Sequence, residues 1–152
     1  MTKHDSFSHH LNYDRITDYI FIGSNVCCQT HFEEKLLKKG VSANISLETK
    51  PGNMVIGVDV FLWLPTPNNL PPSFHAMSAG VSLLKDLERQ RLTTYVNCSL
   101  GHGRAPTLVA GYLITEKGMS AEEAMRFIKE RRHAVHFERA QIDALVKIEL
   151  QK

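Results

Sequence analysis

The sequence has little net charge, few cysteines and no long hydrophobic run, and each shortage excludes a class of protein. Its 18 lysines and arginines exceed its 16 aspartates and glutamates by only two, which is too small an excess to predict a nucleic-acid or membrane-surface partner. No apolar run approaches the roughly 18 residues that span a bilayer, and residues 1–10 lack the apolar core of a targeting segment. We therefore expect neither nucleic acid nor membrane as a partner.

The three cysteines, Cys27, Cys28 and Cys98, are an odd number without the spacing of a disulfide framework. Such usage is typical of a reducing compartment, so we expect a cytoplasmic location. Cys27 and Cys28 could act as a redox pair that resolves an oxidised Cys98. Adjacent cysteines form only a strained ring, however, which favours two ordinary buried thiols.

The histidines near the start of the chain do not form a recognisable metal site. The spacing of His4, His9, His10 and His31 matches no closed ligand set, so we predict no metal and no cofactor. Residues 1–12 are polar, and we expect a disordered tail there. With no internal repeat or linker, residues 13–152 are expected to form one domain and a monomer.

Hydrophobic periodicity predicts strands that alternate with helices early in the chain and helices that accumulate late. Strands are expected at residues 16–22, 41–47, 55–64 and 94–97, and helices at 32–39, 73–90, 104–117, 120–132 and 138–151. This order is typical of an α/β fold, with a central and mostly parallel sheet flanked by helices. Ligands of such sheets bind beyond the carboxyl ends of the strands.

Several local signals support these elements. Ser73 is a cap for the helix that follows a stiff, proline-rich loop at 65–72, and Ser120 with Glu123 forms a capping box. A turn is expected at residues 51–53. The charged cluster at residues 129–132 is typical of a solvated helix face.

The most informative segment is the loop Cys98-Ser99-Leu100-Gly101-His102-Gly103-Arg104, between a predicted strand and a predicted helix. Glycines allow backbone N–H groups to converge on an oxyanion, and the helix start adds its positive dipole end. Arg104 offers a planar fork for two phosphate oxygens, and the same field favours the nucleophilic thiolate of Cys98. The Lys-Ser/Thr pair of a nucleotide-binding P-loop is missing. We therefore predict that residues 98–104 bind phosphate and that Cys98 attacks it.

Residues 96–107, Val-Asn-Cys-Ser-Leu-Gly-His-Gly-Arg-Ala-Pro-Thr, resemble the signature loop of the dual-specificity branch of the protein tyrosine phosphatase superfamily. Residues 19–24, 63–66 and 108–114 resemble its first strand, the entry to its general-acid loop and the helix behind its signature loop. The resemblance implies a central sheet flanked by helices. It also implies metal-independent hydrolysis of phosphate monoesters through a phosphocysteine, with Cys98 and Arg104 as catalytic residues.

Three positions depart from the pattern of this family. Asn97 stands where the family usually has a histidine that organises the loop, and Ala105 stands where a hydroxyl often assists thiolate departure. Asn68, 30 residues before Cys98, occupies the position of the general acid, and residues 60–85 contain no carboxylate. His75 and Asp59 are weaker substitutes. Since an asparagine cannot donate a proton as an acid, we expect a slow general-acid step.

Two classes of function therefore stay open, a slow phosphatase and a phosphate-binding module that has lost turnover. Only His102 could add positive charge inside the loop, which favours a phosphoprotein substrate over a highly phosphorylated lipid. Phosphoglucan stays open, because an Ala-Pro pair after the arginine also resembles plant glucan phosphatases. Trp63 is expected in the core, with a place in the site beside the acid loop as the alternative. His133 and His136 are expected on the surface, with the pocket rim as the alternative.

Overall fold

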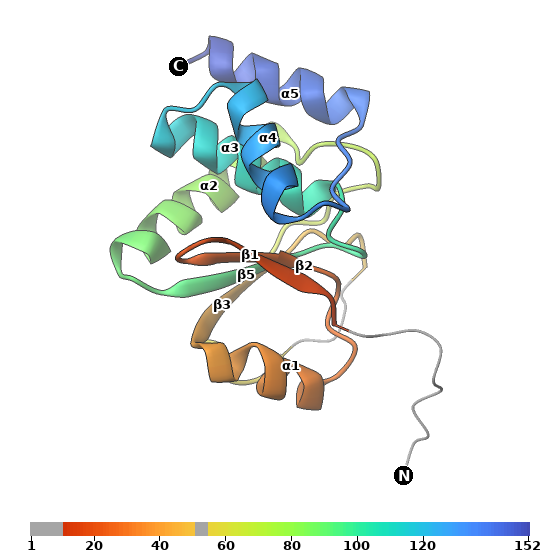
Figure 1. Ribbon diagram of the computed structural model, residues 1–152, viewed down its shortest axis with the longest axis vertical. Helices are drawn as coiled ribbons and strands as arrows, with labels where there is room; N and C mark the ends of the chain where they lie inside the picture. Colours follow the sequence, from red (N-terminus) through yellow and green to blue (C-terminus); the bar gives the residue numbers. More distant parts are fainter. Residues whose placement is uncertain (1–10, 51–54) are drawn as a thin grey trace.

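The computed structural model in Figure 1 describes residues 11–50 and 55–152. Five strands form one sheet in the order β1-β2-β5-β3-β4. They are β1 (Tyr13–Thr17), β2 (Ile20–Gly23), β3 (Val41–Ser46), β4 (Val60–Trp63) and β5 (Thr93–Asn97). β1 and β2 are antiparallel, and the other neighbours are parallel. The predicted α/β class with a mostly parallel sheet is confirmed.

Helices cover both faces of the sheet, but unequally. α1 (Gln29–Lys35), followed by the short 3-10 turn η1 (Leu37–Lys39), lies on one face. On the other face lie α2 (Phe74–Arg89), α3 (Arg104–Lys117), α4 (Ala121–Arg131) and α5 (Arg139–Leu150), as Figure 1 shows. The expectations for His4, His9, His10 and the turn at 51–53 fall outside the described residues, as does most of the expected tail.

The alternation of side chains along the central strands creates two hydrophobic cores. Ile22 and Val96 face the large helical layer, in the same cluster as Leu108 of α3. Their neighbours Phe21 and Tyr95 face the other way and pack in a smaller cluster with Phe32 of α1. The sheet is therefore buried on both faces, which is typical of parallel sheets in α/β proteins.

α3 is the centre of the helical layer and is buried from Arg104 to Ile114. Close packing against α2 depends on small residues. A Cβ built on Gly80 would lie 2.6 Å from Leu108 Cδ1, and one built on Gly111 would lie 2.5 Å from Met77 Sδ. The start of α3 is consequently fixed in place at the carboxyl edge of the sheet, directly after β5.

Two of the expected strands differ from the structure. The single strand predicted at 16–22 is instead the hairpin of β1 and β2, which turns at Asp18 and Tyr19. The strand predicted at 55–64 is regular only in β4, because residues 55–59 are bends and irregular chain. The helix expected at 32–39 begins earlier, at Gln29, and ends in η1 with Gly40 in the left-handed conformation.

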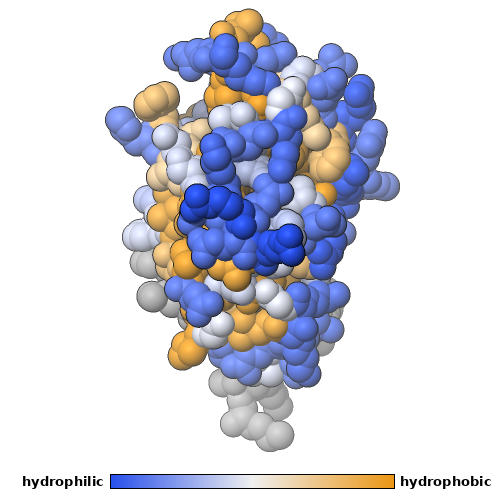
Figure 2. Space-filling view, turned by 90° about the vertical axis from the view of Figure 1, so that its left-hand side faces the viewer, coloured by the Kyte–Doolittle hydropathy of each residue, from blue (hydrophilic) through white to orange (hydrophobic). Residues whose placement is uncertain are grey.

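The other predicted helices agree closely with α2, α3, α4 and α5. Ser73 caps α2 by accepting a hydrogen bond from Ala76 N, and the capping box of Ser120 and Glu123 is present. In the described part of the chain, no helix has the length and apolar character needed to cross a membrane. On the face drawn in Figure 2, hydrophilic residues form a broad band that separates smaller apolar patches.

Candidate active site

The loop from Cys98 to Arg104 connects β5 to α3 and lies at the edge where the parallel strands end. Cys98 is 2% exposed and Arg104 is 5% exposed, and both line a pocket of about 280 Å³. The pocket is lined by Asn68, Asn69, Cys98, Ser99, Leu100, His102, Gly103, Arg104, His136, Glu138 and Gln141. It is thus small, at the lower end of the range for small-molecule sites.

The carbonyl groups of residues 99–103 all accept hydrogen bonds from donors outside the loop. Ser99 O accepts from Asn25 N (3.0 Å), Leu100 O from Arg132 Nη2 (2.9 Å), Gly101 O from Arg132 Nε (2.9 Å), His102 O from His136 N (2.8 Å), and Gly103 O from Thr107 N (2.9 Å) and Oγ1 (2.7 Å). The N–H groups of residues 99–103 donate to no other described residue. Unpaired donors beside a helix start are the components of an anion site.

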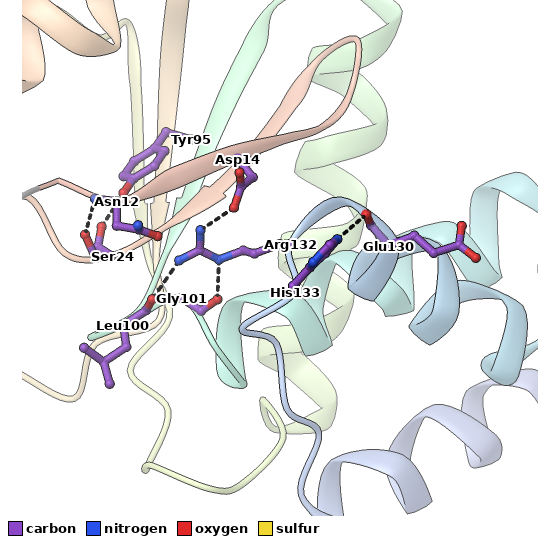
Figure 3. A network of polar contacts seen from close by, with 9 residues as sticks. All are labelled: Asn12, Asp14, Ser24, Tyr95, Leu100, Gly101, Glu130, Arg132 and His133. Carbon is purple, nitrogen blue, oxygen red and sulfur yellow. Dashed lines mark hydrogen bonds and ion pairs between the residues drawn. The ribbon is translucent and has the colours of Figure 1, made fainter.

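Arg132 holds the far side of the loop, as Figure 3 shows. Its side chain is 1% exposed and bonds two loop carbonyls while Nη1 pairs with Asp14 Oδ2 at 2.8 Å. The prediction that residues 129–132 form a solvated face is therefore wrong for Arg132. Arg132 directly follows the last residue of α4 in extended conformation, and its side chain lies between the hairpin and the loop. No local sequence signal distinguishes it from its exposed neighbours.

Gly101 makes close contact between the loop and β2 possible. It has φ of +70°, and a Cβ built on it would lie 2.5 Å from the carbonyl carbon and oxygen of Gly23. It is the one residue of the loop that does not line the pocket. Its role is to let the loop turn beneath the pocket floor, where a side chain would have no space.

Of the side-chain nitrogens of Arg104, only Nη1 makes hydrogen bonds to the described residues. Nη1 donates to Thr66 O at 2.8 Å and to Leu47 O at 3.2 Å. Nε is buried and has no hydrogen-bond partner among the described residues. Since a buried charged donor without a partner is costly, the guanidinium is arranged for a ligand that accepts from it.

Asn97 and Ala105, which depart from the family pattern, are both buried. Asn97 Oδ1 accepts from Asn44 Nδ2 at 2.8 Å, and the same amide donates to Tyr95 O at 3.0 Å. The asparagine therefore replaces the usual histidine with a buried amide pair across β3 and β5. Thr107, two residues beyond Ala105, does not replace the missing hydroxyl, because its Oγ1 donates to Gly103 O.

Asn68 and its neighbour Asn69 help to line the same pocket as the loop, whereas His75 and Asp59 do not. The fold therefore brings Asn68 to the same pocket as Cys98, and its role as the acid position stays a prediction. Asn69 has φ of +67°, in the left-handed region that asparagine tolerates better than most residues.

Three titratable side chains besides Cys98 and Arg104 line the pocket: His102, His136 and Glu138. Burial, together with the positive charge of Arg132, lowers the pKa of His102 below its ordinary value. The imidazole is thus mainly neutral at neutral pH and adds little positive charge. Glu138 caps α5 by accepting from the backbone of Gln141, and its Oε1 lies 3.5 Å from His136 Nε2.

Sequence reasoning missed Glu138 and Gln141, although their capping-box pattern places them at a helix start. It assigned His136 to the surface, and the structure finds it both exposed and on the pocket rim. His133 is exposed and contacts Glu130 O instead (Figure 3).

The expectation that Trp63 lies in the core is wrong. Trp63 is 39% exposed, because the face of β4 that carries it is not covered, and its Nε1 donates to Glu48 O at 2.7 Å.

Comparisons with known proteins agree with this geometry. Residues 20–151 match the family "Dual specificity phosphatase, catalytic domain". The human phosphatidylglycerophosphatase and protein-tyrosine phosphatase 1 is 32% identical over 80 residues, which are 53% of this chain and 40% of that protein. The mouse protein tyrosine phosphatase type IVA 2 is 35% identical over 107 residues, which are 66% of this chain and 63% of that protein.

The crystal structure of PTPMT1 superimposes with a TM-score of 0.82 at 23% identity, covering 91% of this chain and 94% of that one, which shows a shared fold. The curated relatives are longer, and this chain spans less than two thirds of either of them. The family match covers most of the sequence, including the whole pocket loop. The chain therefore belongs to the dual specificity phosphatase family.

Proposed function

We propose that this chain hydrolyses phosphate monoesters through a phosphocysteine on Cys98. The observation that carries the proposal is the orientation of the loop. Its carbonyls are bonded outward, so the N–H groups of residues 99–103 and Arg104 Nε are left for an anion in the pocket that Cys98 lines. Such preorganised donors stabilise the charge that develops on phosphoryl oxygens without reorganisation.

The reaction takes two steps in this proposal. The Cys98 thiolate attacks phosphorus, the S–P bond forms and the P–O bond to the leaving group breaks. The leaving oxygen takes a proton and departs as an alcohol or phenol. Water then attacks the phosphocysteine, which releases inorganic phosphate and the thiolate. Arg104 and the loop N–H groups hold the three non-bridging oxygens through both steps.

We further propose that protonation of the leaving group is the weak step. Asn68 has no acidic proton, and removal of a general acid typically costs about 10²–10⁴-fold in rate. Phenolate leaves more readily without protonation than alkoxide does. Aryl phosphates, including phosphotyrosine, are therefore the substrates that this pocket is expected to turn over best.

The substrate proposed first is a phosphoprotein. The described pocket contains no lysine, and its loop histidine is mainly neutral, so it suits one phosphate rather than several. Leu100, 61% exposed at the rim, offers an apolar surface to an aryl ring. A phospholipid headgroup is the second candidate, because a similar human protein is named phosphatidylglycerophosphatase and PTPMT1 has been crystallised with PI(5)P.

The test is a turnover assay with p-nitrophenyl phosphate, a phosphotyrosine peptide, a phosphoserine peptide and phosphatidylglycerophosphate. Cys98→Ser should abolish hydrolysis of all of them. Asn68→Asp should raise the rate on the alkyl phosphates by up to about 10²-fold and the aryl rate by less, and it should add a new limb to the pH profile. Asn69→Asp is the matched control, because it adds the same charge to the same pocket one residue away.

Hydrolysis that survives Cys98→Ser would refute the phosphocysteine mechanism. Equal effects of Asn68→Asp and Asn69→Asp would refute the assignment of the acid position. If the chain binds phosphate or vanadate at Arg104 but shows no Cys98-dependent turnover on any substrate, the module that binds without turnover is the correct function.

A further inference from the structure

Three side chains with metal-binding atoms meet at the start of α1, away from the phosphate pocket. Cys27 Sγ lies 3.8 Å from Cys28 Sγ and 2.9 Å from His31 Nδ1, and all three atoms lie within 4.8 Å of one another. The three residues are half-buried, so the expectation of buried thiols is wrong for both cysteines. No disulfide joins them, and none of the three lines the pocket.

We propose that Cys27, Cys28 and His31 form a binding site for a thiophilic divalent cation, with Zn²⁺ as the best fit. Two Zn–S bonds of about 2.3 Å at the tetrahedral angle place their sulfurs about 3.8 Å apart, which is the separation seen here. A Zn–N bond of about 2.0 Å needs the His31 nitrogen about 0.6 Å farther from Cys27 Sγ than it lies. That shift is within reach of side-chain rotation.

The donor set selects the class of metal. Two thiolates and an imidazole favour Zn²⁺ over Mg²⁺ or Ca²⁺, which prefer oxygen ligands. On binding, both thiols lose their protons to solvent and His31 contributes a neutral nitrogen. The two thiolates then balance the charge of the cation. Three protein ligands leave one tetrahedral position for water.

The site is connected to the phosphate loop by hydrogen bonds from the residues that precede it. Asn25, two residues before Cys27, donates its N–H to Ser99 O at 3.0 Å. Ser24 O accepts from the buried hydroxyl of Tyr95 on β5. A cation held by residues 27, 28 and 31 would therefore stiffen the segment that supports the outer side of the loop, and it would tie the start of α1 to the end of β2.

The test is titration of the reduced, full-length chain with Co²⁺, followed by competition with Zn²⁺. Tetrahedral coordination by thiolates gives intense visible d–d bands and a near-ultraviolet thiolate-to-metal band. We expect both bands with the unaltered chain. Cys27→Ser, Cys28→Ser and His31→Gln should each weaken binding by about 100-fold or more, since loss of a supporting residue alone costs about 10–100-fold.

Two control variants separate this site from other ligands in the chain. Cys98→Ser removes the remaining thiol, and a triple replacement of His4, His9 and His10 by Gln removes the histidines near the N-terminus. Both should keep the bands and the affinity. Circular dichroism of each variant without metal checks that it folds.

The proposal is overturned if Co²⁺ does not produce the thiolate band, or if the band survives in both Cys27→Ser and Cys28→Ser. It is also overturned if Cys98→Ser or the triple histidine variant removes the band. The cluster would then be a hydrogen-bonded group of thiols and imidazole.

Discussion

Replacing Arg132 with alanine is expected to destabilise the fold and to disable the phosphate site together. The substitution leaves the buried carbonyl of Gly101 without a donor, which costs about 1–3 kcal/mol. Leu100 O and Asp14 are part-exposed and can rehydrate, so each adds about 0.5–1 kcal/mol. The sum is about 2–5 kcal/mol, a large fraction of the roughly 5–15 kcal/mol that stabilises a typical domain.

Urea denaturation measures the loss of unfolding free energy. In thermal denaturation, the melting temperature should fall by roughly 4–20 °C. Calorimetric titration with vanadate measures the loss of anion binding. We expect weaker binding, because the loop N–H groups lose their fixed orientation without Arg132. Asp14→Asn is the matched control. It removes only the part-exposed ion pair and should cost less than about 1 kcal/mol with little change in vanadate affinity. The reasoning fails if Arg132→Ala is no more destabilising than Asp14→Asn, or if it binds vanadate normally.

Two further predictions concern other parts of the loop. Gly101→Ala should abolish phosphate binding and destabilise the fold more than Gly118→Ala. Both glycines have φ of +70°, but only a Cβ on Gly101 would meet backbone atoms, at 2.5 Å. Equal losses of unfolding free energy in urea denaturation would exclude the close contact with Gly23. Burial and the charge of Arg132 lower the pKa of His102 in the folded state. The folded state therefore binds fewer protons at His102 than the unfolded state does. As a result, the free energy of unfolding falls as the pH drops through the unfolded pKa, near 6.5, toward the lower folded pKa. An NMR titration of the His102 ring should have its midpoint below 6.5, and Arg132→Met should raise it; a midpoint at or above 6.5 would contradict the assigned cause.

The parts of the fold that could be predicted from sequence are those fixed by local chemistry. The bounds of α3 follow from the glycines that precede and follow it, and Ser73 and Ser120 mark helix starts by their capping hydroxyls. The phosphate loop was visible because a thiol, two glycines and an arginine have few other reasons to occur at that spacing. The placement of Asn68 in the same pocket followed from the resemblance rather than from local patterning.

The incorrect or absent predictions concern properties that only tertiary packing decides. The turn between β1 and β2, at Asp18 and Tyr19, has no glycine or proline to mark it, so the sequence does not show where one strand ends and the next begins. Arg132 lies in a run of charges, and only the docking of α4 against the hairpin buries it. Glu138 and His136 reach the pocket from a connection about 40 residues beyond the nucleophile, a proximity that periodicity cannot reveal.

The outward hydrogen bonds of the loop carbonyls also make the loop depend on segments that lie far from it in the sequence. Their donors come from the segment after β2, the end of α4, the connection before α5 and the first turn of α3. A chain that ended before residue 132 would contain the complete signature from Cys98 to Arg104 and yet lack the donors that turn its N–H groups inward. If the loop binds phosphate as proposed, we expect that affinity only in chains whose C-terminal helices have docked, so that phosphate binding would report on complete folding.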